Sequence, residues 1–179
     1  MKFQFILSII LAVSTLNVDA QQMPSINPTG TFTPSTGEAS EDVTSFQGSA
    51  PIVAQFKANA ENTNGWTTYY EWRFTKEGEN SPYLVRYEQD TEYTFTSAGT
   101  HRIILYAIFT QGTDTVAFTK EYWAENVPIT VSISESKLEF PNAFSPNGDG
   151  INDIYKAKDG FQSITDFHAY IYNRWGQLL

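Results

Sequence analysis

The residues of this sequence best suited to hold a ligand through oxygen atoms lie close together near the C-terminus. Asn147, Asp149, Asn152 and Asp153 place four oxygen-bearing side chains within seven positions, with glycines between them. Such spacing is similar to that of a calcium loop, in which carboxylate and amide oxygens surround the ion. Ile151, however, occupies a ligand position of the EF-hand pattern, and no glutamate supplies its closing bidentate ligand. A structural Asx turn is therefore favoured over a calcium site.

A second group of acidic residues has the side chains needed for acid and base catalysis. Glycoside hydrolysis uses two carboxylates at a defined separation, one of them with a raised pKa. In this sequence the candidates fall in turns and on strand positions expected to face solvent, and a small sandwich offers no cleft to desolvate them. The sequence therefore predicts a protein that is not an enzyme. The carboxylates considered are Glu71, Glu77, Glu88, Asp90 and Glu92.

Other reactive side chains are scarce. The sequence has no cysteine, which excludes disulfides, thiolate zinc sites, a cysteine nucleophile and a lipoprotein anchor. His101 and His168 are the two histidines, and neither has a companion at metal-binding spacing. Neither a Gly-x-Ser-x-Gly elbow nor a glycine-rich phosphate loop occurs. We therefore expect no cofactor.

Aromatic residues make up 15% of the chain and offer another kind of binding surface. Aromatic rings stack on the C–H faces of pyranose sugars, and Trp66, Tyr69 and Trp123 are the candidates expected to be exposed. The commoner role of such residues is packing in a core or on a strand face, as expected for Trp72. A carbohydrate-binding module therefore stays as an alternative to an adhesive or spacer module.

Length and charge set limits on the partners. A chain of 179 residues is long enough for one domain and part of another. Its formal net charge is -9, with acidic residues spread along the sequence and no basic patch. This charge argues against nucleic acid as a partner and leaves proteins or surface glycans.

The N-terminal residues predict a targeting segment followed by a linker. Residues 1–20 contain one lysine followed by a short apolar run. They end in Val18-Asp19-Ala20, with small or apolar residues at the -3 and -1 positions of a cleavage site, which predicts a signal peptide cleaved before Gln21. The apolar run is too short to span a membrane comfortably, so we expect no transmembrane anchor after cleavage. Residues 21–48 are rich in Ser, Thr, Pro and Gly and predict a flexible linker with one edge strand near Thr31 to Thr33.

Residues 49–134 show the period-two alternation of half-buried strands. In the clearest case, Tyr70, Trp72 and Phe74 face one way and Glu71 faces the other. About seven short strands separated by turn signals predict an antiparallel sandwich of immunoglobulin type. The expected strands cover residues 51–58, 66–75, 83–87, 92–96, 101–110, 113–123 and 127–134.

Two segments of this region resemble polycystic-kidney-disease-type (PKD) domains, which are immunoglobulin-like sandwiches. Residues 70–74, Tyr-Glu-Trp-Arg-Phe, are similar to the family segment YxWDFGDG, and residues 93–105 are similar to YTxxGTYxVxL. Arg73 stands where the family has Asp, and residues 75–78 replace its Gly-Asp-Gly turn. The resemblance implies the fold, and PKD domains serve as spacers or as protein or glycan contact modules on extracellular proteins.

Residues 135–179 form the last expected unit. The run Phe140–Asp153, FPNAFSPNGDGIND, combines a short edge strand around Phe140 with a tight glycine and Asx turn. About twenty residues later comes a second strand-like run, Tyr170–Gly176. Together these runs resemble the gliding-motility-associated C-terminal domain of Bacteroidetes, the type B sorting domain of the type IX secretion system. Tyr155 stands where that family often has Phe.

The resemblance implies that type IX secretion machinery recognises this unit and delivers the protein through the periplasm to the outer-membrane surface or the medium. The family domain continues for several strands past the position of Leu179, so we expect a partial second small β domain. The whole is expected to be all-β, and a fragment of a larger secreted hydrolase is a further alternative. The residues implied to carry the sorting signature are Phe140, Pro141, Asn142, Phe144, Ser145, Pro146, Asn147, Gly148, Asp149, Gly150, Asn152, Asp153, Asn173, Arg174, Trp175 and Gly176.

Overall fold

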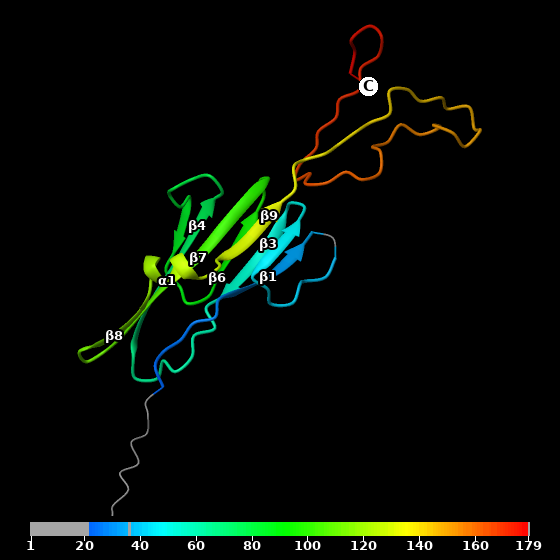
Figure 1. The fold of residues 1–179 in the computed structure, drawn as a ribbon. Coiled ribbons are helices and arrows are strands. Elements are labelled where there is room, and N and C mark those ends of the chain that lie inside the picture. Colours follow the sequence, from blue (N-terminus) through cyan, green and yellow to red (C-terminus); the bar gives the residue numbers. More distant parts are fainter. Residues whose placement is uncertain (1–21, 36, 179) are drawn as a thin grey trace, which may run out of the picture.

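The computed structural model describes residues 22–35 and 37–178, which form a β sandwich and a long C-terminal segment (Figure 1). The predicted signal peptide at residues 1–20 lies outside this range. The almost all-β composition confirms the predicted fold class. The elements are β1 (Thr29–Pro34), β2 (Ser45–Gly48), β3 (Ile52–Lys57), β4 (Thr67–Lys76), β5 (Leu84–Arg86), β6 (Thr91–Phe95), β7 (Gly99–Gln111), β8 (Asp114–Phe118), α1 (Lys120–Glu125) and β9 (Ile129–Ile133).

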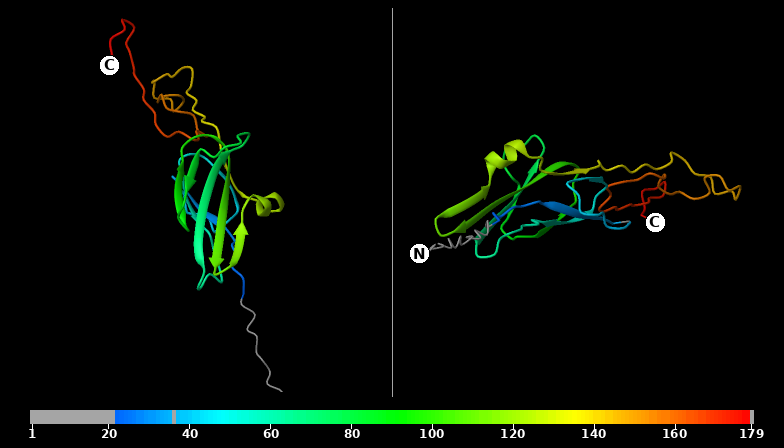
Figure 2. Two further views of the ribbon diagram at one scale, coloured as in Figure 1. Left: turned by 90° about the vertical axis from the view of Figure 1, so that its left-hand side faces the viewer. Right: turned by 60° about the horizontal axis from the view of Figure 1, so that its bottom comes forward.

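The strands form two sheets. One has the order β1-β3-β6, and the other has the order β2-β9-β7-β4-β5, with β8 also paired to β7. Neighbours run antiparallel except β2 and β9, which are parallel. Two such sheets, with neighbours that are not consecutive in sequence, are typical of immunoglobulin-like sandwiches. The first described residues and the C-terminal segment lie at opposite ends of the sandwich (Figure 2).

The core follows the predicted alternation. In β4, Trp72 and Phe74 are fully buried, whereas Glu71 between Tyr70 and Trp72 is not. Phe56 of β3 contacts Trp72 with ring centroids 5.8 Å apart, which joins the two sheets. The indole N–H of Trp72 donates to the carbonyl of Gln89 at 3.1 Å, so this buried polar group is satisfied. Each fully buried aromatic side chain of this kind contributes about 1.5–3 kcal/mol to stability.

One edge of β7 is shared by two strands. Residues 99–103 pair with β9, and residues 107–111 pair with β8. The break between these pairings falls at Leu105, where Trp123 of α1 donates its indole N–H to the Leu105 carbonyl at 2.7 Å. The buried indole therefore fills the place where the chain crosses from β8 to β9.

This crossover corrects the predicted strand at residues 113–123. The strand β8 ends at Phe118, and the last residues of the predicted strand lie in α1. The chain has to leave the sheet there, because Trp123 reaches back to β7 from beyond its edge.

The structure also corrects the flexible linker predicted for residues 21–48. The expected edge strand near Thr31 to Thr33 is β1, but β2 was missed and both strands belong to the sheets. Phe32 is fully buried, and its ring stacks on that of Phe46 with centroids 4.7 Å apart. Burial of this pair compensates for the ordering of a polar segment.

The strands predicted in the C-terminal segment are not formed among residues 135–178. That range has only isolated bridges, between Lys137 and Gln162 and between Tyr172 and Leu178. A β ladder needs a buried face to be stable, and here Tyr172 and Leu178 are both more than half exposed. No helix in the described part of the chain has the length and apolar character required to cross a membrane.

The break in the β7 edge gives a first prediction. We expect Trp123→Phe to lower the free energy of unfolding by about 1–3 kcal/mol, because it leaves the buried Leu105 carbonyl without the indole donor. Urea denaturation of the purified chain measures this change. Tyr122→Phe in the same helix is the matched control and should be close to neutral, and equal stability of both variants would contradict the role assigned to the indole.

Candidate functional site

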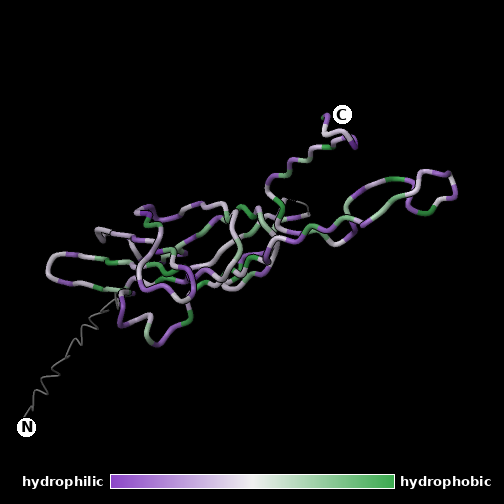
Figure 3. Tube along the Cα trace, turned by 90° about the horizontal axis from the view of Figure 1, so that it is seen from above, coloured by the Kyte–Doolittle hydropathy of each residue, from purple (hydrophilic) through white to green (hydrophobic). Residues whose placement is uncertain are grey.

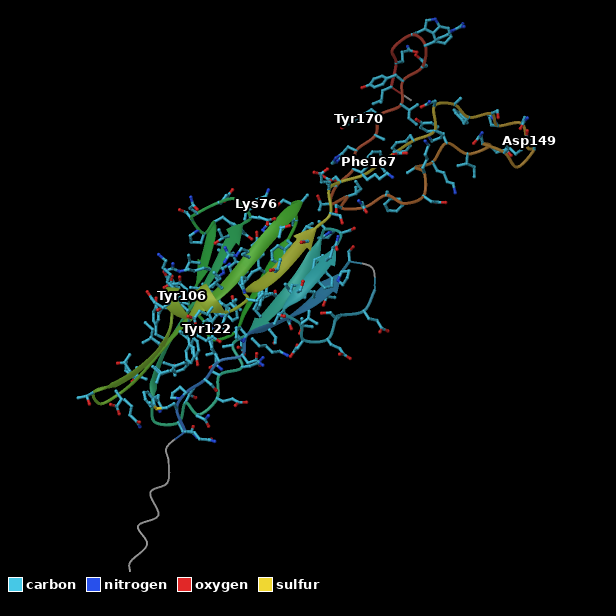
Figure 4. The ribbon with its side chains drawn as sticks, viewed as in Figure 1. Lys76, Tyr106, Tyr122, Asp149, Phe167 and Tyr170 are labelled. Atoms are coloured by element: carbon cyan, nitrogen blue, oxygen red, sulfur yellow. The ribbon has the colours of Figure 1, made fainter. Side chains whose placement is uncertain are left out.

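The C-terminal segment, residues 135–178, extends from one end of the sandwich. Asp149 lies on a loop well away from the sheets, whereas Phe167 lies between this loop and the sandwich (Figure 4). Apolar residues recur along the segment well outside the sandwich (Figure 3). The segment therefore has its own local order and its own exposed apolar surface.

Four aromatic rings form the small centre of this segment. Phe140 stacks against Tyr155 and against Phe167, both with centroids 5.6 Å apart. Phe144 reaches Tyr155 at the same separation. The ring of Tyr155 therefore contacts two of the other three rings. These contacts hold together the two sides of the loop that carries Asp149.

Side-chain hydrogen bonds to the backbone fix the distal turn. The carboxylate of Asp153 accepts the backbone N–H groups of Gly148 and Gly150, each at 2.7 Å. Asp149 accepts the N–H of Ile151 at 2.8 Å, and the amide of Asn147 donates to Asp149 at 2.9 Å. Gly148 and Gly150 have φ values of 81° and 82°, in the left-handed region that glycine adopts at little steric cost.

These contacts show how the acidic side chains of the turn are used. Both carboxylate oxygens of Asp153 face backbone N–H groups, and these hydrogen bonds lower its pKa. The pKa of Asp149 is also lowered, first by the Asn147 amide and then by the Ile151 N–H. Asn152 contributes through its backbone, since its φ is 55° and its carbonyl accepts the N–H of Ser145 at 2.9 Å. The arrangement is that of a structural Asx turn.

The second half of the motif forms another turn of the same kind. The side-chain oxygen of Asn173 accepts the N–H groups of Trp175 and Gln177, at 2.9 and 3.0 Å. Gly176 has a φ of 78° and donates its N–H to the Asn173 carbonyl. Arg174 lies over the Trp175 ring, 4.2 Å from its centroid. Within residues 135–178, no hydrogen bond or ring contact joins this turn to the one around Asp153.

Ser163 connects the segment to the sandwich, and the sequence analysis missed it. Its side chain is buried, accepts the backbone N–H of Ala50 at 3.2 Å and donates to the carbonyl of Ser134 at 2.6 Å. The hydroxyl of Ser136 donates to the Ser163 carbonyl at 2.8 Å. Ala50 precedes β3 and Ser134 follows β9, so one hydroxyl joins the ends of both sheets to the segment.

Large apolar side chains on the segment remain open to solvent. Ile154 is 73% exposed, Trp175 70% and Tyr170 67%. Scattered exposed apolar residues are common on proteins, whereas a contiguous apolar patch is typical of an interaction surface. Of these three exposed residues, Trp175 belongs to the sequence-predicted motif, whereas Ile154 and Tyr170 were not predicted.

Of the three aromatic residues predicted to be exposed as glycan contacts, only Tyr69 is exposed. Trp66 and Trp123 are buried, which corrects the expectation that they face solvent, because each indole packs into the hydrophobic core of the sandwich. Tyr69 is exposed, as expected, at 44%. Alternation along β4 places Tyr69 on the outer face, but it gives no signal for the depth of residues outside the strands, such as the two tryptophans.

The Asp153 contacts predict a pH dependence for the turn. A lowered folded-state pKa means that the stabilisation is present above the unfolded pKa, about 3.9, and is lost as the pH falls through the folded value. We expect the amide NMR signals of Gly148 and Gly150 to hold their hydrogen-bonded shifts above about pH 4 and to lose them together in acid. Asp153→Asn should remove this transition, whereas Asp159→Asn, outside the turn, should keep it.

The Ser163 contacts predict a loss of stability on removal of the hydroxyl. Ser163→Ala leaves the Ala50 N–H and the Ser134 carbonyl without this partner, so the free energy of unfolding should fall by about 1–3 kcal/mol. Hydrogen exchange at the Ala50 amide should also accelerate. Thr165→Ala, at a nearby exposed position, is the control. Unchanged Ala50 exchange in Ser163→Ala would contradict the anchor.

Comparison with known proteins adds one match. Residues 138–179 match the family model described as the CHU_C Type IX secretion signal domain. No curated protein and no solved structure matches the chain. The match covers both turns and the aromatic cluster, and it confirms the resemblance seen in the sequence. C-terminal to its β sandwich, at residues 138–179, the chain therefore carries a type IX secretion signal domain.

Proposed function

We propose that this protein is a non-catalytic adhesive or spacer module that type IX secretion delivers to the outside of the cell. The type IX secretion signal domain carries the first part of this conclusion, since it implies recognition by the type IX machinery and export to the cell surface or the medium. In this proposal the protein passes through the periplasm and then crosses the outer membrane. Cleavage of the signal peptide at residues 1–20 precedes it.

The surface of the signal domain supports a recognition role. Two turns fixed by Asp153 and Asn173 hold the backbone in defined shapes, and these turns flank apolar side chains that face solvent. A partner gains affinity by covering such side chains when the loops that carry them are already ordered. In this proposal Trp175 and Tyr170 contact the machinery, while Phe140, Gly148, Gly150, Asp153 and Asn173 shape the surface.

The sandwich supports a role without catalysis. Glu71, the carboxylate best placed on a strand, accepts hydrogen bonds from Tyr69 at 3.0 Å and from Arg73 at 2.6 Å. The other carboxylates considered for acid and base chemistry, from Glu77 to Glu92, are exposed. Two hydrolytic carboxylates need a shared site in which one is desolvated, and these side chains do not form one. A folded sandwich that precedes the signal domain in the chain suits a spacer or a contact module.

Export of truncated and whole chains tests the proposal. In a bacterium with a type IX system, the whole chain should reach the surface or the medium, as detected with antibodies to the sandwich on intact cells and in culture supernatant. Deletion of residues 138–179 should leave the sandwich in the periplasm, and so should expression of the whole chain in a strain that lacks the secretion system. Equal export of whole and deleted chains would overturn the role of the signal domain.

A further inference from the structure

The outer face of the six-stranded sheet is unusually rich in aromatic and aliphatic side chains. A sheet that faces water on one side normally places polar residues there. Here the register sets Tyr69 opposite Ile108, Glu71 opposite Tyr106 and Arg73 opposite Ile104. The β7 side of these pairs is therefore apolar or aromatic, whereas the β4 side has Tyr69 followed by the polar Glu71 and Arg73.

Two tyrosines of this face are open to solvent. Tyr69 of β4 is 44% exposed and Tyr87, which directly follows β5, is 63% exposed. Their ring centroids are 6.2 Å apart and the ring planes are inclined by 47°. Tyrosine rings at this separation present two adjacent apolar faces, each with a hydroxyl at its tip.

A charged pair lies beside these rings and is held in place. One carboxylate oxygen of Glu71 accepts the hydroxyl of Tyr69 at 3.0 Å, and the other accepts the Nε–H of Arg73 at 2.6 Å. The Arg73 guanidinium in turn lies 4.2 Å from the centroid of the ring of Tyr106, a residue of β7 that is labelled in Figure 4. The Glu71 side chain is only 15% exposed, so its position is fixed by its neighbours.

We propose that this face, made of Tyr69, Tyr87, Glu71, Arg73 and Tyr106, binds a neutral polysaccharide. The two exposed rings stack on the C–H faces of successive sugar residues, while Glu71 and Arg73 exchange hydrogen bonds with the sugar hydroxyl groups. This inference rests on the proposed role of the sandwich as an exported contact module and names its ligand class.

The chemistry of the face favours a sugar over a protein. An apolar protein surface placed over the Glu71–Arg73 pair would desolvate it without replacing its water hydrogen bonds, which is costly. Sugar hydroxyl groups replace those water molecules while the ring carbons cover the tyrosines. The net charge of -9 and the central carboxylate disfavour an acidic polysaccharide, so the expected ligand is uncharged.

Affinity electrophoresis of the whole chain tests the site. The native gels contain xyloglucan, mixed-linkage β-glucan or galactomannan as neutral polymers, or polygalacturonate as an acidic one. We expect retardation in at least one neutral gel and none in polygalacturonate. Tyr69→Ala and Tyr87→Ala should each weaken the binding about tenfold, as expected for loss of one ring contact of about 1.4 kcal/mol. Tyr69→Phe keeps the ring and should retain most of the binding.

Tyr172→Ala is the matched control, because it removes a tyrosine outside the sandwich that is 59% exposed and should leave retardation unchanged. Absence of retardation in every neutral gel overturns the proposal. Retardation that persists when Tyr69→Ala and Tyr87→Ala are combined also overturns it. A third contrary outcome is that the chain associates with itself and that either substitution abolishes this association. Binding is measured on purified protein, so a failure here is distinguishable from a failure of export.

Discussion

The pairing of β4 with β7 is the interaction on which the rest of the structure depends. It runs over ten residue pairs, from Thr67 with Thr110 to Lys76 with His101. Because side chains alternate across a strand, this one register sends Trp72 and Leu105 into the core together and sends Glu71 and Tyr106 outward together. A slip of one residue would invert both faces. The core and the outer tyrosine face are thus two results of the same register.

The opposite edge of β7 determines how the signal domain is attached. Pairing with β9 at one end and with β8 at the other leaves a break at Leu105, which the Trp123 indole fills. With β9 held in this way, Ser134 lies at its end and accepts the hydrogen bond from Ser163. The same Ser163 hydroxyl accepts the N–H of Ala50, which lies just before β3. The attachment point therefore exists only when both sheets are assembled.

Much of the sandwich, and the type of both C-terminal turns, follow from local sequence. The alternation in β4 and β7 depends only on which residues must avoid water, and the glycine and Asx residues of the turns act within a few positions. The missed features need partners distant in sequence. Phe46 is one aromatic residue in a polar stretch until it stacks on Phe32. Ser163 is one serine among many until the chain brings Ala50 and Ser134 to it.

The architecture of the signal domain explains which residue types its motif contains and how they are spaced. Its four packed rings bury little surface compared with the sandwich core, so backbone hydrogen bonds to the side chains of Asp153 and Asn173 must define the backbone. Side chains of this kind act only at set spacings from the amides they bind, which fixes residue types along the two turns. The rings of Trp175 and Tyr170 are more than half exposed, and within the segment Arg174 lies over the ring of Trp175. An apolar ring left in water contributes nothing to folding, which is why the proposed contact with the secretion machinery is assigned to these two rings.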